Sequence, residues 1–256
     1  MNNQMPKASE LLRGRKKILV TGGAGFIGGS VVRRLLQETE VTVFNLDKMG
    51  YASDLSSINK VLTGLDKAHQ TRHQLLKVDL KNQKEVQTAV QKADPDMVLH
   101  LAAESHVDRS ITAPGQFLDS NVIGTYSLLQ AVLCHYRQLS EERKAMFRML
   151  HISTDEVFGS LGEKGRFSEN TPYAPRSPYS ASKAASDHLV QAWHHTFGLP
   201  VVITNCSNNY GPWQFPEKLI PVVILKAIEG ESIPLYGDGK NIRDWLYVED
   251  HVDARS

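Results

Sequence analysis

Short apolar runs alternate along the chain with longer stretches whose apolar positions recur at helical spacing. The alternation starts at Lys17 and is typical of βαβ units, which build a parallel sheet. The apolar runs are nearly continuous, as strands covered on both faces require. Strands are predicted over 18–21, 41–46, 74–78, 97–101, 148–153 and 201–204. We therefore expect an α/β fold with a doubly wound parallel sheet.

Helical periodicity fills most of the intervals between these strands. Helices are predicted over 26–37, 84–91, 117–139 and 178–197. The last is well delimited, because Ser177 can cap it, Pro178 suits its first position and Gly198 follows its end. After residue 204 the chain is punctuated by proline and glycine up to residue 244, with one helix expected over 217–228. We place a domain boundary at that change.

Composition narrows the class of protein. The 256 residues are 41% hydrophobic, enough for one substantial core. Lysine and arginine total 29 against 28 acidic residues, so no net charge favours nucleic acid or an anionic membrane. Cys134 and Cys206 lack metal-ligand spacing, and two thiols favour a reducing compartment, so we expect a cytoplasmic protein without a metal. No run approaches the roughly 20 apolar residues that span a bilayer.

A glycine-rich run, TGGAGFIG at 21–28, connects the first strand to the first helix. Gly22, Gly25 and Gly28 permit a tight turn and let main-chain N–H groups approach a pyrophosphate at the helix N-terminus. Asp47 ends the second strand, where a carboxylate can accept hydrogen bonds from the adenosine ribose and repel a 2′-phosphate. This pattern predicts a Rossmann domain that binds NAD rather than NADP. The alternative is a structural glycine turn with surface aspartates.

Two further strand ends belong to the same expected crevice. Asp79 follows the third strand, where it can meet the adenine edge. Ala102 and Ala103 follow the fourth strand and are small enough for a cofactor to lie against them. His100 and His106 flank these alanines, and we expect both to be hydrogen-bonded structural histidines without a chemical role.

Tyr179 and Lys183 lie four residues apart on the helix that begins at Pro178, so their side chains share one face. A nearby ammonium and the positive helix N-terminus both favour tyrosinate, so we expect a lowered pKa that makes Tyr179 a general base. Lys183 could also hydrogen-bond the nicotinamide ribose. The same spacing occurs by chance on many helices, and it gains weight here from the glycine turn that precedes it.

The fifth strand runs into Thr154, Asp155 and Glu156, which place a hydroxyl and two carboxyls at the mouth of the crevice. If a sugar is oxidised at C4, its C5 proton becomes acidic. One carboxylate can then remove that proton while a protonated carboxyl donates to the departing C6 hydroxyl. Neighbouring buried acids push their pKa values apart, which permits the two roles at one pH. The alternative is a solvated turn after a strand.

These residues and several longer motifs resemble the dTDP-glucose 4,6-dehydratase family, an NAD-dependent branch of the extended short-chain dehydrogenases. The matching motifs are TGGAGFIG (21–28), HLAAESHVDRSI (100–111), STDEVFG (153–159), YSASKA (179–184), SNNYGP (207–212), FPEKLIP (215–221) and IRDWLYVEDH (242–251). The resemblance implies that Tyr179 takes the O4 proton, Asp155 is the acid and Glu156 the base of the elimination. Hydride would leave C4 for NAD and return to C6.

The resemblance also implies the remaining binding residues. Thr154 and Ser105 would contact the hexose. The nucleotide sugar would be held by Asn208, Lys218, Leu219, Pro234, Tyr236 and Arg243, of which Arg243 is a natural bidentate phosphate partner. The cofactor would contact Gly22, Gly25, Phe26, Ile27, Gly28, Asp47, Lys48, Asp79, Leu80, Leu101, Ala102, Ala103, Ser105, Ser120, Tyr179, Lys183 and Asn209.

Two departures from the family follow from the same comparison of motifs. Phe158 stands where tyrosine is usual, which is tolerable if its ring is packed. Family members continue beyond residue 256, so we expect a smaller, truncated substrate-binding lobe. The expected organisation is a disordered tail over 1–16, an NAD-binding domain over 17–204 and a partial sugar-nucleotide region over 205–256. By resemblance the helices over 117–139 and 178–197 pair in a homodimer; burial within one chain is the alternative.

Three functions remain open from the sequence. The first is dehydration of dTDP-glucose to dTDP-4-keto-6-deoxyglucose, with dTDP preferred to UDP only by resemblance. The second is a related nucleotide-sugar epimerase or decarboxylase, which needs Tyr179 and Lys183 but no acid pair. The third is a non-catalytic NAD-binding module.

Overall fold

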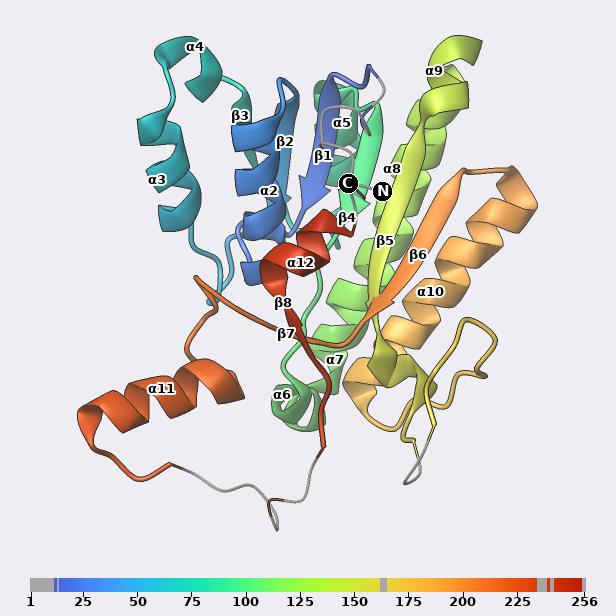
Figure 1. The fold of residues 1–256 in the computed structure, drawn as a ribbon. Helices are drawn as coiled ribbons and strands as arrows, with labels where there is room; N and C mark the ends of the chain where they lie inside the picture. The colour runs from blue at the N-terminus through green and yellow to red at the C-terminus, as the bar shows by residue number, and fades with distance from the viewer. Residues whose placement is uncertain (1–11, 13, 162–164, 234–238, 240–241, 255–256) are drawn as a thin grey trace, which may run out of the picture.

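The computed structural model describes residues 12, 14–161, 165–233, 239 and 242–254. Within them, six parallel strands form one sheet in the order β3-β2-β1-β4-β5-β6 (Figure 1). The strands are β1 Lys17–Thr21, β2 Thr42–Asp47, β3 His73–Lys77, β4 Met97–His100, β5 Arg148–Thr154 and β6 Val201–Cys206. Each overlaps a predicted strand, so the doubly wound parallel sheet is confirmed. Its order reverses between β1 and β4, where ligands bind in such sheets.

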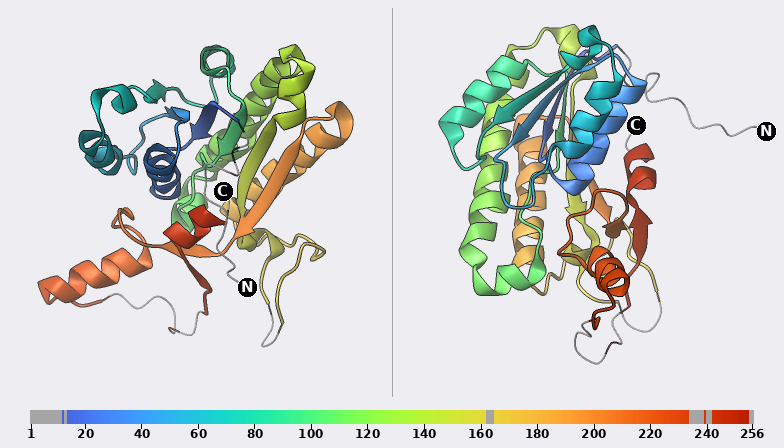
Figure 2. Two further views of the ribbon diagram at one scale, coloured as in Figure 1. Left: turned by 45° about the horizontal axis from the view of Figure 1, so that its top comes forward. Right: turned by 90° about the vertical axis from the view of Figure 1, so that its left-hand side faces the viewer.

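Helices cover both faces of the sheet, as the side view in Figure 2 shows. They are α2 Phe26–Glu38, α3 Ser56–Gly64, α4 Lys67–Gln70, α5 Gln83–Ala93, α6 Val107–Thr112, α7 Pro114–Phe117, α8 Gly124–Gln138, α9 Glu141–Met146, α10 Pro178–Phe197, α11 Leu219–Glu229 and α12 Val248–Asp253. No helix in the described part of the chain is long and apolar enough to cross a membrane.

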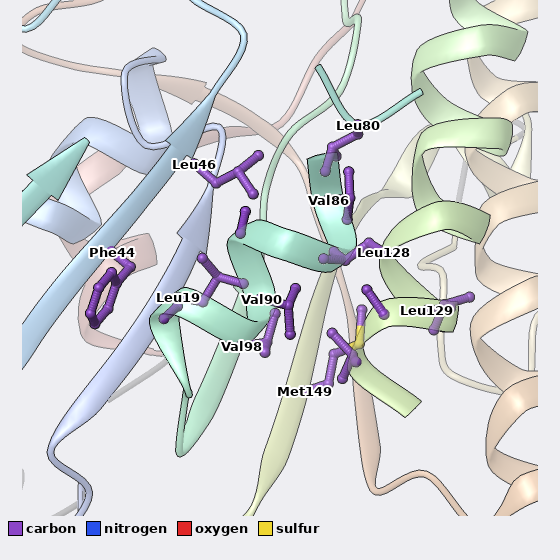
Figure 3. Packing of buried hydrophobic residues seen from close by; sticks show 14 of the residues in the cluster. Leu19, Phe44, Leu46, Leu80, Val86, Val90, Val98, Leu128, Leu129 and Met149 are labelled. Carbon is purple, nitrogen blue, oxygen red and sulfur yellow. The ribbon is translucent and has the colours of Figure 1, made fainter. Parts of the chain in front are cut away.

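Alternate residues of the strands supply two separate hydrophobic cores. Leu19 and Phe44 face α5 and α8, where they join Val90 and Leu128 in one cluster (Figure 3). Their sequence neighbours, such as Ile18, face α2 and α3 on the other side. This period-two division between two buried faces explains why each strand is a nearly continuous apolar run.

Helix α10 has the bounds that were predicted for it. The Ser177 side chain accepts a hydrogen bond from the Ser180 N–H, and the Ser180 side chain accepts one from the Ser177 N–H, which forms a capping box. Pro178 occupies the first turn. Gly198 follows the helix with φ +70°, the left-handed conformation that glycine adopts without strain.

The single helix predicted over 117–139 is wrong in its first third. A π-helical turn, Leu118–Ile123, separates α7 from α8. Asn121 within it donates to Ser182 Oγ at 2.9 Å and to the Glu104 carbonyl at 3.0 Å, and its own carbonyl accepts from Ser186 Oγ at 2.6 Å. These contacts with α10 and with the loop after β4 offset the local cost of a π turn, and apolar periodicity does not reveal them.

Beyond β6 the chain forms a smaller assembly of elements. Strands β7 Asn208–Tyr210 and β8 Trp245–Tyr247 pair in parallel, and α11 begins two residues later than predicted. Helix α11 projects from the body of the molecule (Figures 1 and 2). Helix α12 packs on α2, where Glu249 contacts Arg33 at 3.3 Å and Arg34 at 3.6 Å. The domain boundary at residue 204 stays a prediction, and the expected tail over 1–16 lies mostly outside the described residues.

Candidate active site

A pocket of about 480 Å³ opens along the carboxyl ends of the parallel strands. All of the predicted cofactor residues line it, from Gly22 after β1 to Asn209 after β6. The predicted sugar and catalytic residues Ser105, Thr154, Glu156, Tyr179, Lys183, Asn208, Lys218, Leu219 and Arg243 line the same pocket. Asp155 is not among its lining residues, and Pro234 and Tyr236 lie outside the described residues.

The glycine turn needs glycine at its two ends. Gly22 has φ +72°, and a Cβ there would lie 2.7 Å from the backbone N and Cα of Ala102. A Cβ on Gly28 would lie 2.1 Å from the carbonyl oxygen of Gly22. No side chain caps the start of α2 at Gly25. Bare backbone and uncapped helix N–H groups therefore line the pocket, which is the arrangement that a dinucleotide pyrophosphate requires.

Asp47 ties the second strand end to the loops around it. Its Oδ2 accepts from the Ala24 N–H at 3.1 Å, and its Oδ1 accepts from the Met49 N–H at 2.8 Å and from Ser53 Oγ at 2.9 Å. The carboxylate is nearly buried at 6% exposure but still lines the pocket. A carboxylate has about four lone-pair sites, so one remains for a ribose hydroxyl.

Tyr179 and Lys183 both lie buried on the face of α10 that meets the pocket. Lys183 Nζ donates to the Ile152 carbonyl at 2.8 Å. The prediction of a lowered tyrosine pKa is wrong for the protein by itself: burial, followed by the Glu156 carboxylate, raises the pKa of Tyr179 above its ordinary value. Burial also lowers the pKa of Lys183.

Thr154, Asp155 and Glu156 form a compact turn at the end of β5. Thr154 Oγ1 donates to Asp155 Oδ1 at 3.3 Å and accepts from the Glu156 N–H at 3.3 Å. Burial raises the pKa of Asp155, and burial together with the charge of Asp155 raises the pKa of Glu156. Both carboxyls are thus shifted toward the protonated form, which a proton donor in this pair requires.

The turn is supported from below by packed aromatic rings. Phe158 is 9% exposed and lies against Phe167 and Tyr173, with ring centroids 5.2 Å away in each case. The ring of Phe158 is therefore packed, which was the condition for tolerating phenylalanine in place of the tyrosine usual in the family.

On the sugar side of the pocket, Lys218 Nζ donates to the Ser105 carbonyl at 3.1 Å, which ties FPEKLIP to the strand end after β4. The charges of Arg243 and Lys218 both act on Glu156 and lower its pKa against the effect of burial. Two cations thus lie close enough to the turn to influence a carboxyl there, as expected where a diphosphate binds.

The two histidines of the fourth strand end differ. His100 is buried, with Nδ1 2.7 Å from Thr21 Oγ1 and Nε2 3.0 Å from Thr125 Oγ1, so its structural role is confirmed. His106 Nε2 lies 3.9 Å from Glu217, whereas its buried Nδ1 has no hydrogen-bond partner among the described residues. The expectation of a fully hydrogen-bonded His106 is therefore wrong.

Several residues that line the pocket or contact its lining were not predicted from the sequence. Glu104 forms an ion pair with Lys48 at 2.5 Å. Tyr51 donates to Glu217 at 3.0 Å and carries the Arg109 guanidinium 4.0 Å above its ring. Glu104, Arg109 and Glu217 lie inside the quoted motifs and could have been proposed from them, whereas no motif includes Tyr51.

Comparisons with known proteins agree with this geometry. Residues 19–256 match the family model described as GDP-mannose 4,6 dehydratase. A dTDP-glucose 4,6-dehydratase of Xanthomonas campestris pv. campestris is 56% identical over 236 residues, which are 92% of this chain and 65% of that protein. The chain thus spans slightly less than two thirds of that relative's length.

Solved structures of two similar enzymes also superpose on this chain. DesIV, a dTDP-glucose 4,6-dehydratase of Streptomyces venezuelae crystallised with NAD and dTDP, superposes with a TM-score of 0.81 at 41% identity, covering 92% of this chain and 69% of that one. A Thermus thermophilus UDP-glucose 4-epimerase in complex with NAD gives 0.77 at 30% identity, covering 93% and 72%. The chain therefore belongs to the GDP-mannose 4,6 dehydratase family, and within it is similar to the dTDP-glucose 4,6-dehydratases.

Proposed function

We propose that this chain carries the NAD-dependent dehydration of dTDP-glucose to dTDP-4-keto-6-deoxyglucose. The observation that carries the proposal is the Thr154-Asp155-Glu156 turn, two of whose members line one pocket with Tyr179 and Lys183. An oxidoreductase of this type needs only the tyrosine and lysine. A half-buried carboxyl pair beside them adds the acid and base that water elimination requires.

NAD is the cofactor that the residues fit. The bare turn at Gly22 and Gly28 suits its pyrophosphate, and Asp47 suits an unphosphorylated adenosine ribose. Bound NAD would supply a hydride acceptor for sugar C4 and, after the elimination, a hydride donor for C6. Similar dehydratases have been crystallised with NAD.

The proton transfers of the reaction fall to Tyr179, Glu156 and Asp155. Tyr179 accepts the O4 proton during oxidation, for which the Lys183 ammonium one turn along the helix must offset the burial that raises the pKa of the phenol. Glu156 removes the C5 proton as a carboxylate and, after exchange with solvent, returns a proton to C5 when hydride adds at C6. Asp155, whose pKa burial raises and whose carboxyl hydrogen-bonds the pocket-lining Thr154, donates a proton to the departing C6 hydroxyl. Thr154 and Ser105 hydrogen-bond the hexose.

The nucleotide is the part of the substrate for which similarity gives most support. DesIV was crystallised with dTDP, and the chain carries Asn208, Lys218, Leu219 and Arg243 in the pocket where a diphosphate would lie. A UDP-sugar epimerase is the second candidate, favoured by the Thermus likeness at 30% identity. It would use Tyr179 and Lys183 and leave the carboxyl pair without a role.

Assembly and compartment are also proposed. The helical stretch 117–139 and α10 leave Leu118, Ile123 and Phe197 exposed by 53%, 47% and 42%, which favours a homodimer through these helices. Sedimentation velocity tests it, and a monomer across the micromolar range would contradict it. Neither Cys134 nor Cys206 is part of a disulfide, which favours the cytoplasm.

The test of the function is incubation with NAD and dTDP-glucose in deuterated water. A dehydratase gives a keto sugar lighter by one water, apart from incorporated deuterium, with solvent deuterium at C5. An epimerase gives a C4-inverted sugar without loss of water, and a binding module gives no product. Because the chain spans about two thirds of its relatives, the assay includes a version extended at its C-terminus.

A further inference from the structure

A buried carboxylate, Asp187, lies behind the pocket in the layer where α10 packs on β5. Its side chain and that of His151 both have 0% exposure. Asp187 accepts three hydrogen bonds, from His151 Nε2 at 3.0 Å, Ser153 Oγ at 2.7 Å and Tyr173 OH at 2.9 Å. A buried charge is costly to keep, and three donors on one carboxylate mark a position at which the charge is retained.

These contacts join the two elements that carry the proposed catalytic residues. Asp187 lies one helical turn beyond Lys183 on α10. Ser153 immediately precedes Thr154 on β5, and Lys183 Nζ donates to the carbonyl of Ile152 just before it. Asp187 and Lys183 therefore fasten α10 to adjacent residues of β5, directly below the turn at 154–156.

The charges in this layer also depend on Asp187. Burial lowers the pKa of Lys183, and the negative charge of Asp187 raises it. Burial raises the pKa of Asp187, but the hydrogen bond from His151 and the charge of Lys183 hold it below its usual range. The ammonium and the carboxylate thus stabilise one another in a region that excludes water.

Three other titratable groups that face this layer are neutral near pH 7. His151 on β5 has its pKa lowered to about 4 by burial and by Lys183, and burial raises the pKa of Tyr173 to about 12. His100 on β4 is buried and its pKa is lowered. The Cys206 thiol on β6, which also raises the pKa of Lys183, and His188, whose ring lies 5.4 Å from Tyr173, face the same layer.

We propose that Asp187 is a positioning residue for the reaction proposed above. It fixes Lys183 and the end of β5 relative to each other, and it supplies the buried negative charge that keeps Lys183 an ammonium. The inference rests on the proposed function, because that function gives Lys183 its task beside Tyr179. Asp187 does not line the pocket, so it acts through Lys183 and Ser153.

The test is Asp187→Asn, which keeps the shape and removes the charge. We expect KM for the sugar nucleotide to change little and kcat to fall. The alkaline limb of the kcat profile should move toward neutral pH by about one unit or more, because Lys183 loses its counter-charge. The pH above which NADH affinity falls should shift by the same amount, since Lys183 would contact the cofactor ribose.

Tyr173→Phe is the matched control, because it removes one hydrogen bond to Asp187 and leaves the charge in place. Its alkaline limb should stay where the wild type has it. The proposal would be overturned if the alkaline limb of the kcat profile did not shift in Asp187→Asn, or if it shifted equally in Tyr173→Phe. If Asp187→Asn does not fold, Asp187→Glu replaces it: the charge is kept, so kcat should fall without a shift, and a shifted limb would overturn the proposal.

The two proposals fail separately. A wild type that binds NADH but never dehydrates the sugar would refute the proposed function. The pH dependence of NADH affinity in Asp187→Asn would still decide whether Asp187 sets the charge of Lys183.

Discussion

Gly22 and Gly198 have the same left-handed backbone in very different surroundings. Their φ angles are +72° and +70°. A Cβ on Gly22 would lie 2.7 Å from backbone atoms of Ala102, whereas nothing lies within 4 Å of a Cβ on Gly198. Gly22→Ala and Gly198→Ala therefore share the backbone cost, and only Gly22→Ala must push the turn away from the strand end after β4.

The magnitudes follow from these two contributions. A residue with a Cβ in the left-handed region costs about 1 to 2 kcal/mol, which we expect as the loss of unfolding free energy in Gly198→Ala. Contact with backbone that cannot move aside adds about 1 to 3 kcal/mol. Gly22→Ala should therefore lose about 2 to 5 kcal/mol.

Urea denaturation measures both losses, and a titration with NAD measures the effect on the site. NAD affinity should fall in Gly22→Ala, whose turn forms the pocket, and stay unchanged in Gly198→Ala at the far end of α10. Equal stability losses in the two variants would refute the close approach of Gly22 to Ala102. An unchanged NAD affinity in Gly22→Ala would refute the binding of the cofactor pyrophosphate by this glycine turn.

Further predictions concern the buried titratable groups. Glu156→Gln should lower kcat by a factor of about 10² to 10⁴, because the elimination loses its base. Oxidation at C4 should persist, so NADH absorbance should build up in a single turnover. Turnover without NADH build-up would contradict the role of Glu156 as the base. Burial raises the folded-state pKa of Glu156, so its contribution to stability is complete below its unfolded pKa and is lost as pH rises through the folded pKa. Glu156→Gln should therefore raise the urea midpoint near pH 7 but not near pH 4; a lower midpoint near pH 7 would count against a desolvated carboxyl. His151 has the opposite sign, since its pKa falls from 6.5 to about 4 on folding, so its contribution is complete above 6.5 and is lost as pH falls toward 4. His151→Gln should therefore lose less stability than the wild type as pH falls from 6.5 toward 4. An equal loss of stability in the two proteins would show that His151 is not held neutral.

The sheet could be predicted because its strands are buried on both faces. Runs such as Ile18 to Val20 are apolar without a break, and each predicted strand lies within about two residues of the observed one. Helix α10 was predicted to the residue because Ser177, Pro178 and Gly198 mark its ends chemically. The π turn over Leu118–Ile123 was not, because its stabilising contacts from Asn121 reach residues far away in the sequence.

Some features of the site could likewise be predicted from the sequence, and others could not. Residues at strand ends, such as Asp47 and Thr154, could be placed together because parallel strands end at one edge of the sheet. The pKa of Tyr179 could not be, because it depends on how deeply the fold buries the phenol and how near it places Glu156. The contact of Tyr51 with Arg109 and Glu217 joins three distant segments, and no local pattern in the sequence predicts it.

The central claim is that the turn at Thr154, Asp155 and Glu156 makes this sugar-oxidising pocket a dehydratase. Mass spectrometry and NMR of the product formed from dTDP-glucose and NAD in deuterated water test it most directly. The predicted product has lost one water and carries solvent deuterium at C5. A product with inverted C4 and no loss of water would contradict the claim.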